Sequence, residues 1–343
     1  MKKLLNTLYI NSPEKYLALD GENVVIKESD NEVGRIPVHN LESIVTCGYA
    51  GASPALMGAC AERNIMLSFM TPYGKFLAKV VGAECGNVLV RKTHYQYSED
   101  AQMSLNIAKH FIIGKIYNSR WVIERATRDH AMQLDVEKLK KASENIQVIL
   151  KSVPPVDNID SLRGLEGKAA DFYFSVFDDL ILQQKTEFLF EKRSRRPPLD
   201  NVNAMLSFSY SLLEGMCFSA LKIVGLDPYV GFMHTIRPGR KSLALDLMEE
   251  LRSVFVDRFV ISLINRREIS AKDFVQREDG AVRLKDDARK IFLNAWQVRK
   301  QDIIVHPFLK EKVEWGMVPY VQALLLARFI RGDLEAYPPF LWK

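Results

Sequence analysis

The spacing of hydrophobic residues changes near residue 90 of this sequence, and that change limits the folds open to the chain. Before it, short runs rich in β-branched and aromatic residues alternate with turn residues, as expected for strands at residues 4–10, 16–19, 24–27, 65–70 and 76–81. Ser53 and Pro54 are expected to open one short helix among them. After the polar stretch HYQYSED, long helical periods follow. The pattern predicts an α+β protein with a small N-terminal β-rich domain at residues 1–90 and a larger all-α catalytic domain at residues 91–343.

The composition is that of a folded protein with a weakly basic surface. With 343 residues, of which 48% are hydrophobic, the chain can bury the cores of two domains. The net charge of +5 is mild, so binding of nucleic acid must come from lysines and arginines that are concentrated locally. The four cysteines form no C-x-x-C pair, which argues against a zinc ribbon or a dense disulfide framework and favours reduced thiols at Cys47, Cys60, Cys85 and Cys217.

The sequence predicts neither a targeting signal nor a membrane span. The start, MKKLLNTLYI, at first resembles a signal peptide, but Asn6 and Asn11 interrupt its apolar region. The best later candidate, residues 318–330, contains Gln322 and Arg328 and is shorter than the roughly 20 apolar residues that a bilayer requires. We therefore expect a cytoplasmic protein that makes no membrane contact.

The segment HTIRPGRKSLALDLMEELR, at residues 234–252, joins an imidazole, a cationic turn and a helix that carries acids. Pro238 and Gly239 break any helix that arrives from upstream. Ser242 is well placed to cap the helix that follows, which is expected to begin near Leu243. This combination indicates a functional site.

The predicted helix has an apolar face and a polar face at about 100° per residue. The polar face carries Asp246, Glu250, Ser253 and Asp257. Glu249 falls at the seam between the faces, where a partly desolvated carboxylate suits a metal ligand. The alternative is a charged surface helix with a structural histidine at His234. Three cations lie nearby in the sequence: Arg237, Arg240 and Lys241. Positive side chains next to a metal site have an electrostatic role only if an anion such as phosphate binds between them and the metal, so these residues favour a functional site.

Two earlier segments add candidate residues. Residues 162–174 place Glu166 among glycines and alanines that allow close approach, although a surface glutamate near a helix start is the plainer interpretation. The segment KRSRRPP, at residues 192–198, gathers cations where prolines restrict the chain, and a rigid cationic loop suits phosphate; an ordinary solvated connection is the alternative. Its arginines are Arg193, Arg195 and Arg196.

Three ordered motifs resemble successive signatures of one family. They are EGKAADFYF, RSRRPPLDNVNAMLSFSYSLL and HTIRPGRKSLALDLMEELR, and the family is the CRISPR adaptation endonuclease and integrase, the first-numbered of the CRISPR-associated proteins. The stretches LNTLYI, LALDGENVVI and HNLESIVTCGYAGASPALMGACAERNI also look like the N-terminal domain of that family. The resemblance therefore covers essentially the whole chain.

The resemblance implies a metal-dependent DNA endonuclease and integrase that joins the 3′ ends of short DNA fragments to CRISPR repeats by transesterification. It implies that Glu166, His234 and Glu249 hold Mg²⁺ or Mn²⁺ as the catalytic centre, with Asp246 as an auxiliary acid. The cationic residues at 193–196 and 237–241 would then clamp the DNA backbone.

The resemblance also implies partners. They are double-stranded DNA with 3′ ends, CRISPR repeat DNA, a second copy of the chain joined through the β domain, and the small second-numbered CRISPR-associated protein. We expect no nucleotide cofactor, because the chain contains neither G-x-x-x-x-G-K nor G-x-G-x-x-G. Two alternatives stay open: a repair nuclease of branched DNA that integrates nothing, and a DNA-binding scaffold whose acids are structural. The apolar tail YPPFLWK, at residues 337–343, either folds back or docks on a partner.

Overall fold

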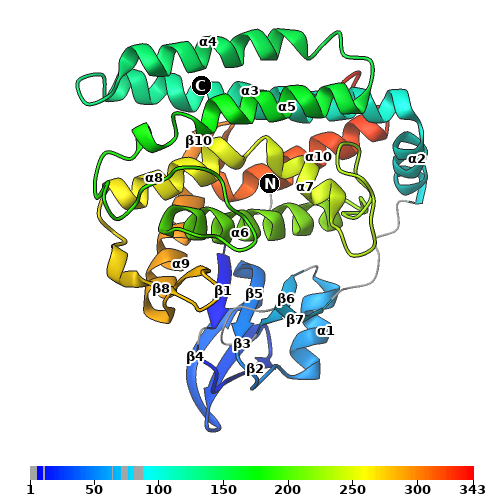
Figure 1. Cartoon of the computed structure of the whole chain (residues 1–343). Coiled ribbons are helices and arrows are strands. Elements are labelled where there is room, and N and C mark those ends of the chain that lie inside the picture. Colours follow the sequence, from blue (N-terminus) through cyan, green and yellow to red (C-terminus); the bar gives the residue numbers. More distant parts are fainter. Residues whose placement is uncertain (1–5, 11, 64, 71–75, 81–87) are drawn as a thin grey trace. The chain divides into compact units, whose positions relative to one another are not determined.

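The computed structural model of the chain describes residues 6–10, 12–63, 65–70, 76–80 and 88–343 (Figure 1). Packing divides the chain into two compact units: residues 1–86 with 293–302, and residues 87–292 with 303–343. A small N-terminal region is β-rich and the remainder is mostly helical, so the predicted α+β fold class is confirmed. The dimerisation role of residues 1–90 stays a prediction.

The β-rich region contains two sheets. In the first, β1 runs parallel to β5, β5 runs parallel to β6, and β6 runs antiparallel to β7. The second is an antiparallel meander in the order β2-β3-β4. The strands are β1 (Asn6–Ile10), β2 (Lys15–Asp20), β3 (Asn23–Glu28), β4 (Asn31–Pro37), β5 (Leu41–Cys47), β6 (Met66–Met70) and β7 (Phe76–Val80). The sequence patterns predicted five of these strands and missed β4 and β5.

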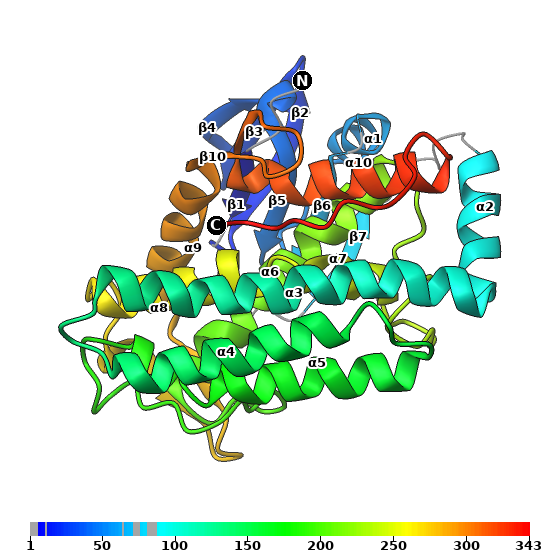
Figure 2. The same cartoon turned by 90° about the horizontal axis from the view of Figure 1, so that it is seen from above.

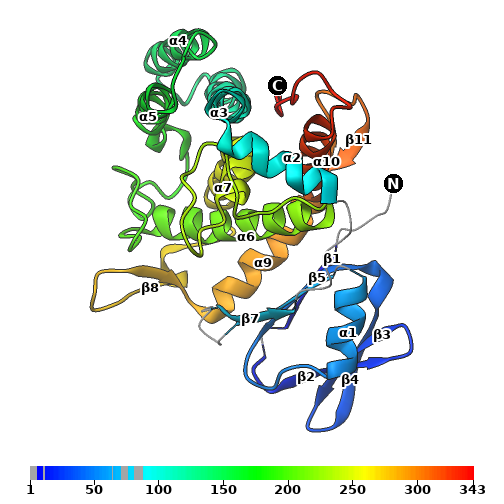
Figure 3. The same cartoon turned by 90° about the vertical axis from the view of Figure 1, so that its right-hand side faces the viewer.

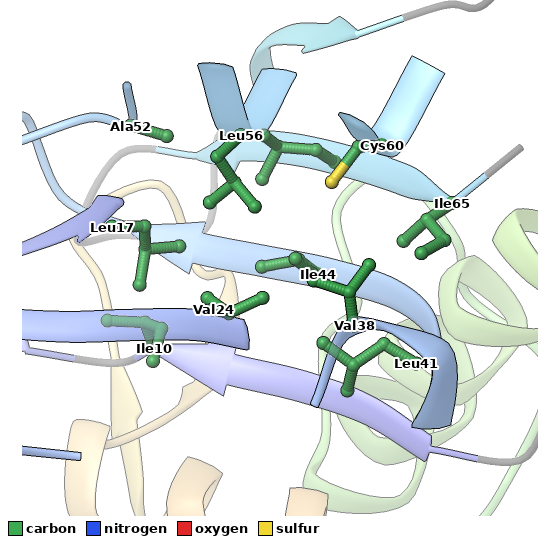
Figure 4. Packing of buried hydrophobic residues seen from close by; sticks show 11 residues of the cluster. Ile10, Leu17, Val24, Val38, Leu41, Ile44, Ala52, Leu56, Cys60 and Ile65 are labelled. Carbon is green, nitrogen blue, oxygen red and sulfur yellow. The ribbon is translucent and has the colours of Figure 1, made fainter. Parts of the chain in front are cut away.

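One helix, α1 (Pro54–Glu62), covers this region as predicted from Ser53 and Pro54. It begins there because the Ser53 hydroxyl accepts a hydrogen bond from the Leu56 amide at 3.2 Å. Apolar side chains from α1, from strands of both sheets and from the segments between these elements form one core (Figure 4): Ile10, Leu17, Val24, Val38, Leu41, Ile44, Ala52, Leu56, Cys60, Ile65 and Leu67. Burial of these side chains is what joins the two sheets.

Cys60 and Cys217 are free and buried, as expected for reduced thiols. Cys85 and the side chain of Cys47 lie outside the described residues.

The rest of the chain is built from long helices with two short β ladders. The helices are α2 (Val88–Glu99), α3 (Ala101–Asp129), α4 (Val136–Ser152), α5 (Ile159–Phe174), α6 (Asn201–Ile223), α7 (Ser242–Glu249), α8 (Arg258–Asn265), α9 (Asp286–Gln301) and α10 (Val318–Ile330). The ladders pair β8 (Phe274–Gln276) with β9 (Val282–Leu284), and β10 (Ile303–Val305) with β11 (Lys312–Glu314). The stretch HYQYSED, predicted as a polar break, lies mostly within α2, where the His94 side chain is buried.

Helices α4 and α5 lie beside α3 (Figure 2), and the end-on view of Figure 3 shows the three grouped together. Each of these helices begins after a residue whose side chain accepts a hydrogen bond from the first turn: Asp100 for α3, Asp135 for α4 and Asn158 for α5. The predicted connector at residues 152–160 thus joins α4 to α5.

Helix α6 is long and apolar enough, by length and composition, to cross a membrane, and it alone passes that test in the described part of the chain. The sequence patterns had pointed to residues 318–330 instead. In the structure 56% of the apolar window of α6 is buried inside the protein, because α6 packs against α7 and α10. A core helix of this kind accounts for the composition without a bilayer.

The C-terminal segment folds back on its own chain. Asn118, on α3, donates hydrogen bonds through Nδ2 to the carbonyls of Glu250 and Phe340, both at 2.7 Å. Its Oδ1 accepts one from the Trp342 amide at 3.0 Å. The Glu250 carboxylate also accepts hydrogen bonds from the Tyr337 hydroxyl and the Phe340 amide. Of the two alternatives for the tail, intramolecular packing is therefore the one observed.

We predict that Asn118→Leu destabilises the protein by about 3 kcal/mol, because two buried carbonyls and one part-buried amide lose their partners, and an unsatisfied buried group costs about 1–3 kcal/mol. Urea unfolding measures the change. Asn106→Leu is the matched control, since Asn106 is exposed on the same helix, and its effect should stay within about 0.5 kcal/mol. Equal unfolding free energies for the two variants would contradict the anchoring role of Asn118.

Candidate active site

The turn before α7 forms as predicted, but the helix is capped differently. Gly239 adopts a φ of +75°, and the Arg240 amide donates to the Arg237 carbonyl at 3.0 Å. Ser242 is the first residue of α7 rather than its cap. Its buried hydroxyl donates instead to the Thr235 carbonyl at 3.1 Å, so the predicted Ser242 cap is wrong.

The predicted polar face of this helix is buried. Asp246 and Glu250 are 0% exposed, and Ser253 and Asp257 are 2% and 1% exposed. The α-helix ends at Glu249, and a π-helical segment, η3 (Arg252–Asp257), leads into α8. The 3.6-residue period therefore does not continue through this region, and α3, α6 and α10 cover it. The interpretation as a charged surface helix is wrong.

Asp246 holds the His234 segment in place. Its carboxylate accepts hydrogen bonds from the backbone amides of Phe232 at 2.6 Å, Met233 at 3.0 Å and His234 at 2.9 Å. Its Oδ1 also lies 2.6 Å from His234 Nδ1. A Cβ atom on Gly231 would stand 2.7 Å from Asp246 Oδ2, so only glycine allows this approach. With Nδ1 engaged, Nε2 is the ring nitrogen left for a ligand.

Glu166 on α5 and Glu249 on α7 meet at one cation. The ammonium of Lys115, on α3, is in close contact with Glu166 Oε1 and lies 2.7 Å from Glu249 Oε2. Arg252 Nη2 lies 2.9 Å from Glu249 Oε1. Two acids from different helices therefore share a single positive group.

The ionisation of Glu249 follows from its neighbours. Burial by itself would raise the pKa of this carboxyl, but the positive charges of Arg252 and Lys115 outweigh burial and lower the pKa to about 2. His234 is close enough for its charge to lower that pKa as well. Glu249 is therefore ionised at neutral pH.

The described residues hold no group of three or more His, Cys, Asp or Glu side chains gathered around one point as metal ligands are. The ammonium of Lys115 lies where the two carboxylates converge. Glu249 Oε2 is buried, and its contact with that ammonium lacks hydrogen-bond geometry. A buried carboxylate oxygen without a hydrogen bond, facing a position already held by a cation, fits a metal ligand.

A cavity of about 40 Å³ adjoins Glu166 and the lysine that it shares with Glu249. Its lining includes Lys115 and Glu166 together with Arg193, Arg195 and Arg252. Two of the predicted basic residues are thus beside Glu166. The guanidinium of Arg193 is also held against α6, because it donates hydrogen bonds to Asn203 Oδ1 at 2.6 Å and to the Ser207 hydroxyl at 3.0 Å.

The other predicted basic residues are placed differently. Arg196 and Arg237 are exposed, and Arg240 is partly buried in the turn. Lys241 Nζ donates to Glu214 Oε1 at 2.6 Å and lies over the Phe218 ring, so an acid already neutralises it. The turn cations are therefore not equivalent to one another.

The sequence patterns missed several residues of this site. Lys115 follows Gly114 on α3. The sequence signal that could have identified it is a lysine among the apolar residues of a helix. Asp257, assigned to a solvated face, instead accepts hydrogen bonds from the hydroxyls of Tyr210 at 2.5 Å and Tyr173 at 3.0 Å. Arg252 stacks over the Tyr210 ring at 4.9 Å. No local spacing brings these residues together, because four separate elements carry them.

We predict that Asp257→Asn flattens the pH dependence of stability. Burial raises the pKa of Asp257 from 3.8 to about 6, even though both tyrosine hydroxyls lower it. Because the folded state binds this proton more tightly, the stabilisation is complete below about pH 4 and is lost as the pH rises through about 6. The loss is about 3 kcal/mol at about 1.4 kcal/mol per pKa unit. Urea unfolding of both proteins at acidic and neutral pH measures it, and identical profiles would contradict the raised pKa.

Comparisons with known proteins point to one family. The sequence pattern of the family described as CRISPR associated protein Cas1 matches residues 8–298. The CRISPR-associated endonuclease Cas1 1 of Chlorobaculum tepidum is 47% identical over 343 residues, which cover 100% of both chains. A solved casposase bound to integration product is 26% identical with a TM-score of 0.82, covering 98% of this chain and 94% of that one.

A further solved structure, a Cas6-RT-Cas1–Cas2 complex, shares the fold with a TM-score of 0.78 and 24% identity, covering 98% of this chain and 36% of that one. Together these matches define a class, the CRISPR-associated endonucleases. The chain belongs to the Cas1 family, and the resemblance seen in its sequence motifs is confirmed.

Proposed function

We propose that this Cas1 protein is a metal-dependent DNA endonuclease and integrase, which joins the 3′ ends of short DNA fragments to CRISPR repeats by transesterification. The observation that carries the proposal is the meeting of Glu166 and Glu249 at one cation position beside an arginine-lined cavity. The similarity to a casposase bound to integration product, at 26% identity over 98% of the chain, supports it.

The residues present fit a divalent cation. Glu166 and Glu249 supply carboxylate oxygens and His234 supplies Nε2, a donor set that suits Mn²⁺ and Mg²⁺. When bound there, such an ion neutralises charge on the attacked phosphate and lowers the pKa of the attacking hydroxyl.

The chain's own residues prepare this site for a phosphodiester. Asp246 fixes the orientation of the His234 ring, and Arg252 holds one oxygen of Glu249 so that the other faces the shared position. Arg193 and Arg195, in the lining of the adjoining cavity, would bind backbone phosphates and hold the strand in line for attack. Contacts of this kind do not depend on base sequence, so the repeat would be selected elsewhere.

The proposed partners follow from the same role. They are double-stranded DNA with 3′ ends, CRISPR repeat DNA, a second copy of this chain joined through residues 1–90, and the small second-numbered CRISPR-associated protein, all in the cytoplasm. A chain with this fold occurs in the Cas6-RT-Cas1–Cas2 complex, which supports the choice of that small protein as a partner.

We predict that Glu166→Gln and His234→Ala each lower strand transfer by at least about a hundredfold, since loss of a ligand should exceed the 10–100-fold effect of an outer-shell partner. Joining of a fragment to repeat DNA in Mn²⁺ is the measurement. Asp160→Asn is the matched control, because Asp160 is exposed on the same helix as Glu166. Cleavage without joining would favour a branched-DNA repair nuclease, and DNA binding that is indifferent to EDTA, with no cleavage, would favour a scaffold.

We predict that Arg195→Gln weakens DNA binding about equally for unrelated sequences and reduces the slope of log affinity against log salt by about 1, as expected for one lost phosphate contact. Fluorescence anisotropy over a range of salt concentrations measures both quantities. Lys141→Gln removes one charge from an exposed position on α4 and serves as the control. An unchanged slope in Arg195→Gln would remove this arginine from the DNA contact.

A further inference from the structure

We propose that Lys115 is a positioning residue that competes with the metal ion and thereby couples metal binding to DNA binding. The proposal rests on the proposed function, because it concerns the same two carboxylates. Lys115 lies in the middle of α3, and its ammonium contacts Glu166 Oε1 and Glu249 Oε2 together. One lysine thus contacts both of the acids that would hold a metal ion.

The bridge is placed where it is strong. The side chains of Lys115, Glu166 and Glu249 are 16%, 24% and 5% exposed, so water screens their attraction far less than at a surface. Arg252 already binds the other oxygen of Glu249, which leaves Oε2 to the lysine. An ion that binds both acids must therefore displace the ammonium from both.

Charge balance makes the displacement costly unless an anion is present. Two carboxylates and two cations, Lys115 and Arg252, compensate one another in this cluster. A divalent cation added to the cluster would leave an uncompensated positive charge beside the released ammonium. The same cavity is also lined by Arg193 and Arg195, which add positive charge. The other acid in its lining, Asp257, already accepts hydrogen bonds from the Tyr210 and Tyr173 hydroxyls, so it is not a ready replacement partner for the Lys115 ammonium.

A DNA phosphate would supply the missing anion. The flexible stem of a lysine lets its ammonium turn from the acids into the cavity that Lys115 lines. DNA would then raise metal affinity by giving the released ammonium a partner, and the metal would raise DNA affinity by the same factor. In this way the site would take up metal tightly only when a strand is bound.

The test is a titration of the full chain with Mn²⁺, in which electron paramagnetic resonance reports the free ion, with and without a short blunt-ended DNA duplex. Without DNA, Lys115→Met should bind Mn²⁺ about tenfold more tightly than the wild type, because the ammonium no longer competes for the two carboxylates. DNA should tighten Mn²⁺ binding several-fold in the wild type and much less in Lys115→Met.

Three further variants sharpen the comparison. Lys115→Arg retains the charge and should keep the weak, DNA-dependent binding. Lys115→Gln is a second neutral variant in case Lys115→Met does not fold, which circular dichroism would reveal. Lys168→Met is the matched control, because Lys168 is exposed on α5, two residues after Glu166.

The outcomes separate this proposal from the proposed function. Wild-type protein that binds no Mn²⁺, with or without DNA, would defeat the metal-dependent function itself. If the wild type binds Mn²⁺, and Lys115→Met and Lys115→Gln bind it with the same affinity and the same response to DNA, the role of Lys115 is overturned. The proposed function would stay intact in that case.

Discussion

The burial of charge around α7 is the constraint on which the rest of the site depends. A carboxylate removed from water costs several kcal/mol unless cations or hydrogen-bond donors compensate it. Glu249 meets that condition through Arg252 and Lys115, and Asp246 through three backbone amides and the His234 ring. Because each compensation needs a particular partner at a particular distance, the acids also fix the positions of the elements around them.

Those partners come from remote parts of the chain, which makes the site a product of helix packing. Lys115 on α3 is 51 residues from Glu166 on α5, and the two helices lie side by side. The C-terminal segment takes part as well, because Asn118 and Glu250 bind its backbone. Glu250 directly follows Glu249, and Asn118 also binds the Glu250 carbonyl. The C-terminal segment therefore helps to hold the site in place, and changes that loosen this segment should also disturb α7.

Local signals predicted much of the fold and most of the candidate residues. Capping chemistry at Ser53 and the change of period near residue 90 identified α1 and the two regions. The same reasoning failed for α7, where it expected a Ser242 cap and a solvated polar face. It failed because η3 changes the helical period and because α3, α6 and α10 pack against the helix. Local spacing in the sequence reveals neither feature.

By itself, the sequence determined the candidate side chains that we propose act on a phosphodiester: two glutamates, a histidine and clustered arginines, set in motifs that resemble one family. Only the tertiary structure decided that Lys115 stands between the glutamates, that Asp246 turns toward His234, and that Lys241 is already paired with an acid. The physical reason is that the energy of an ion pair depends on the distance and burial of its two groups. Both quantities are set by how helices pack, and a residue's neighbours in sequence do not reveal them.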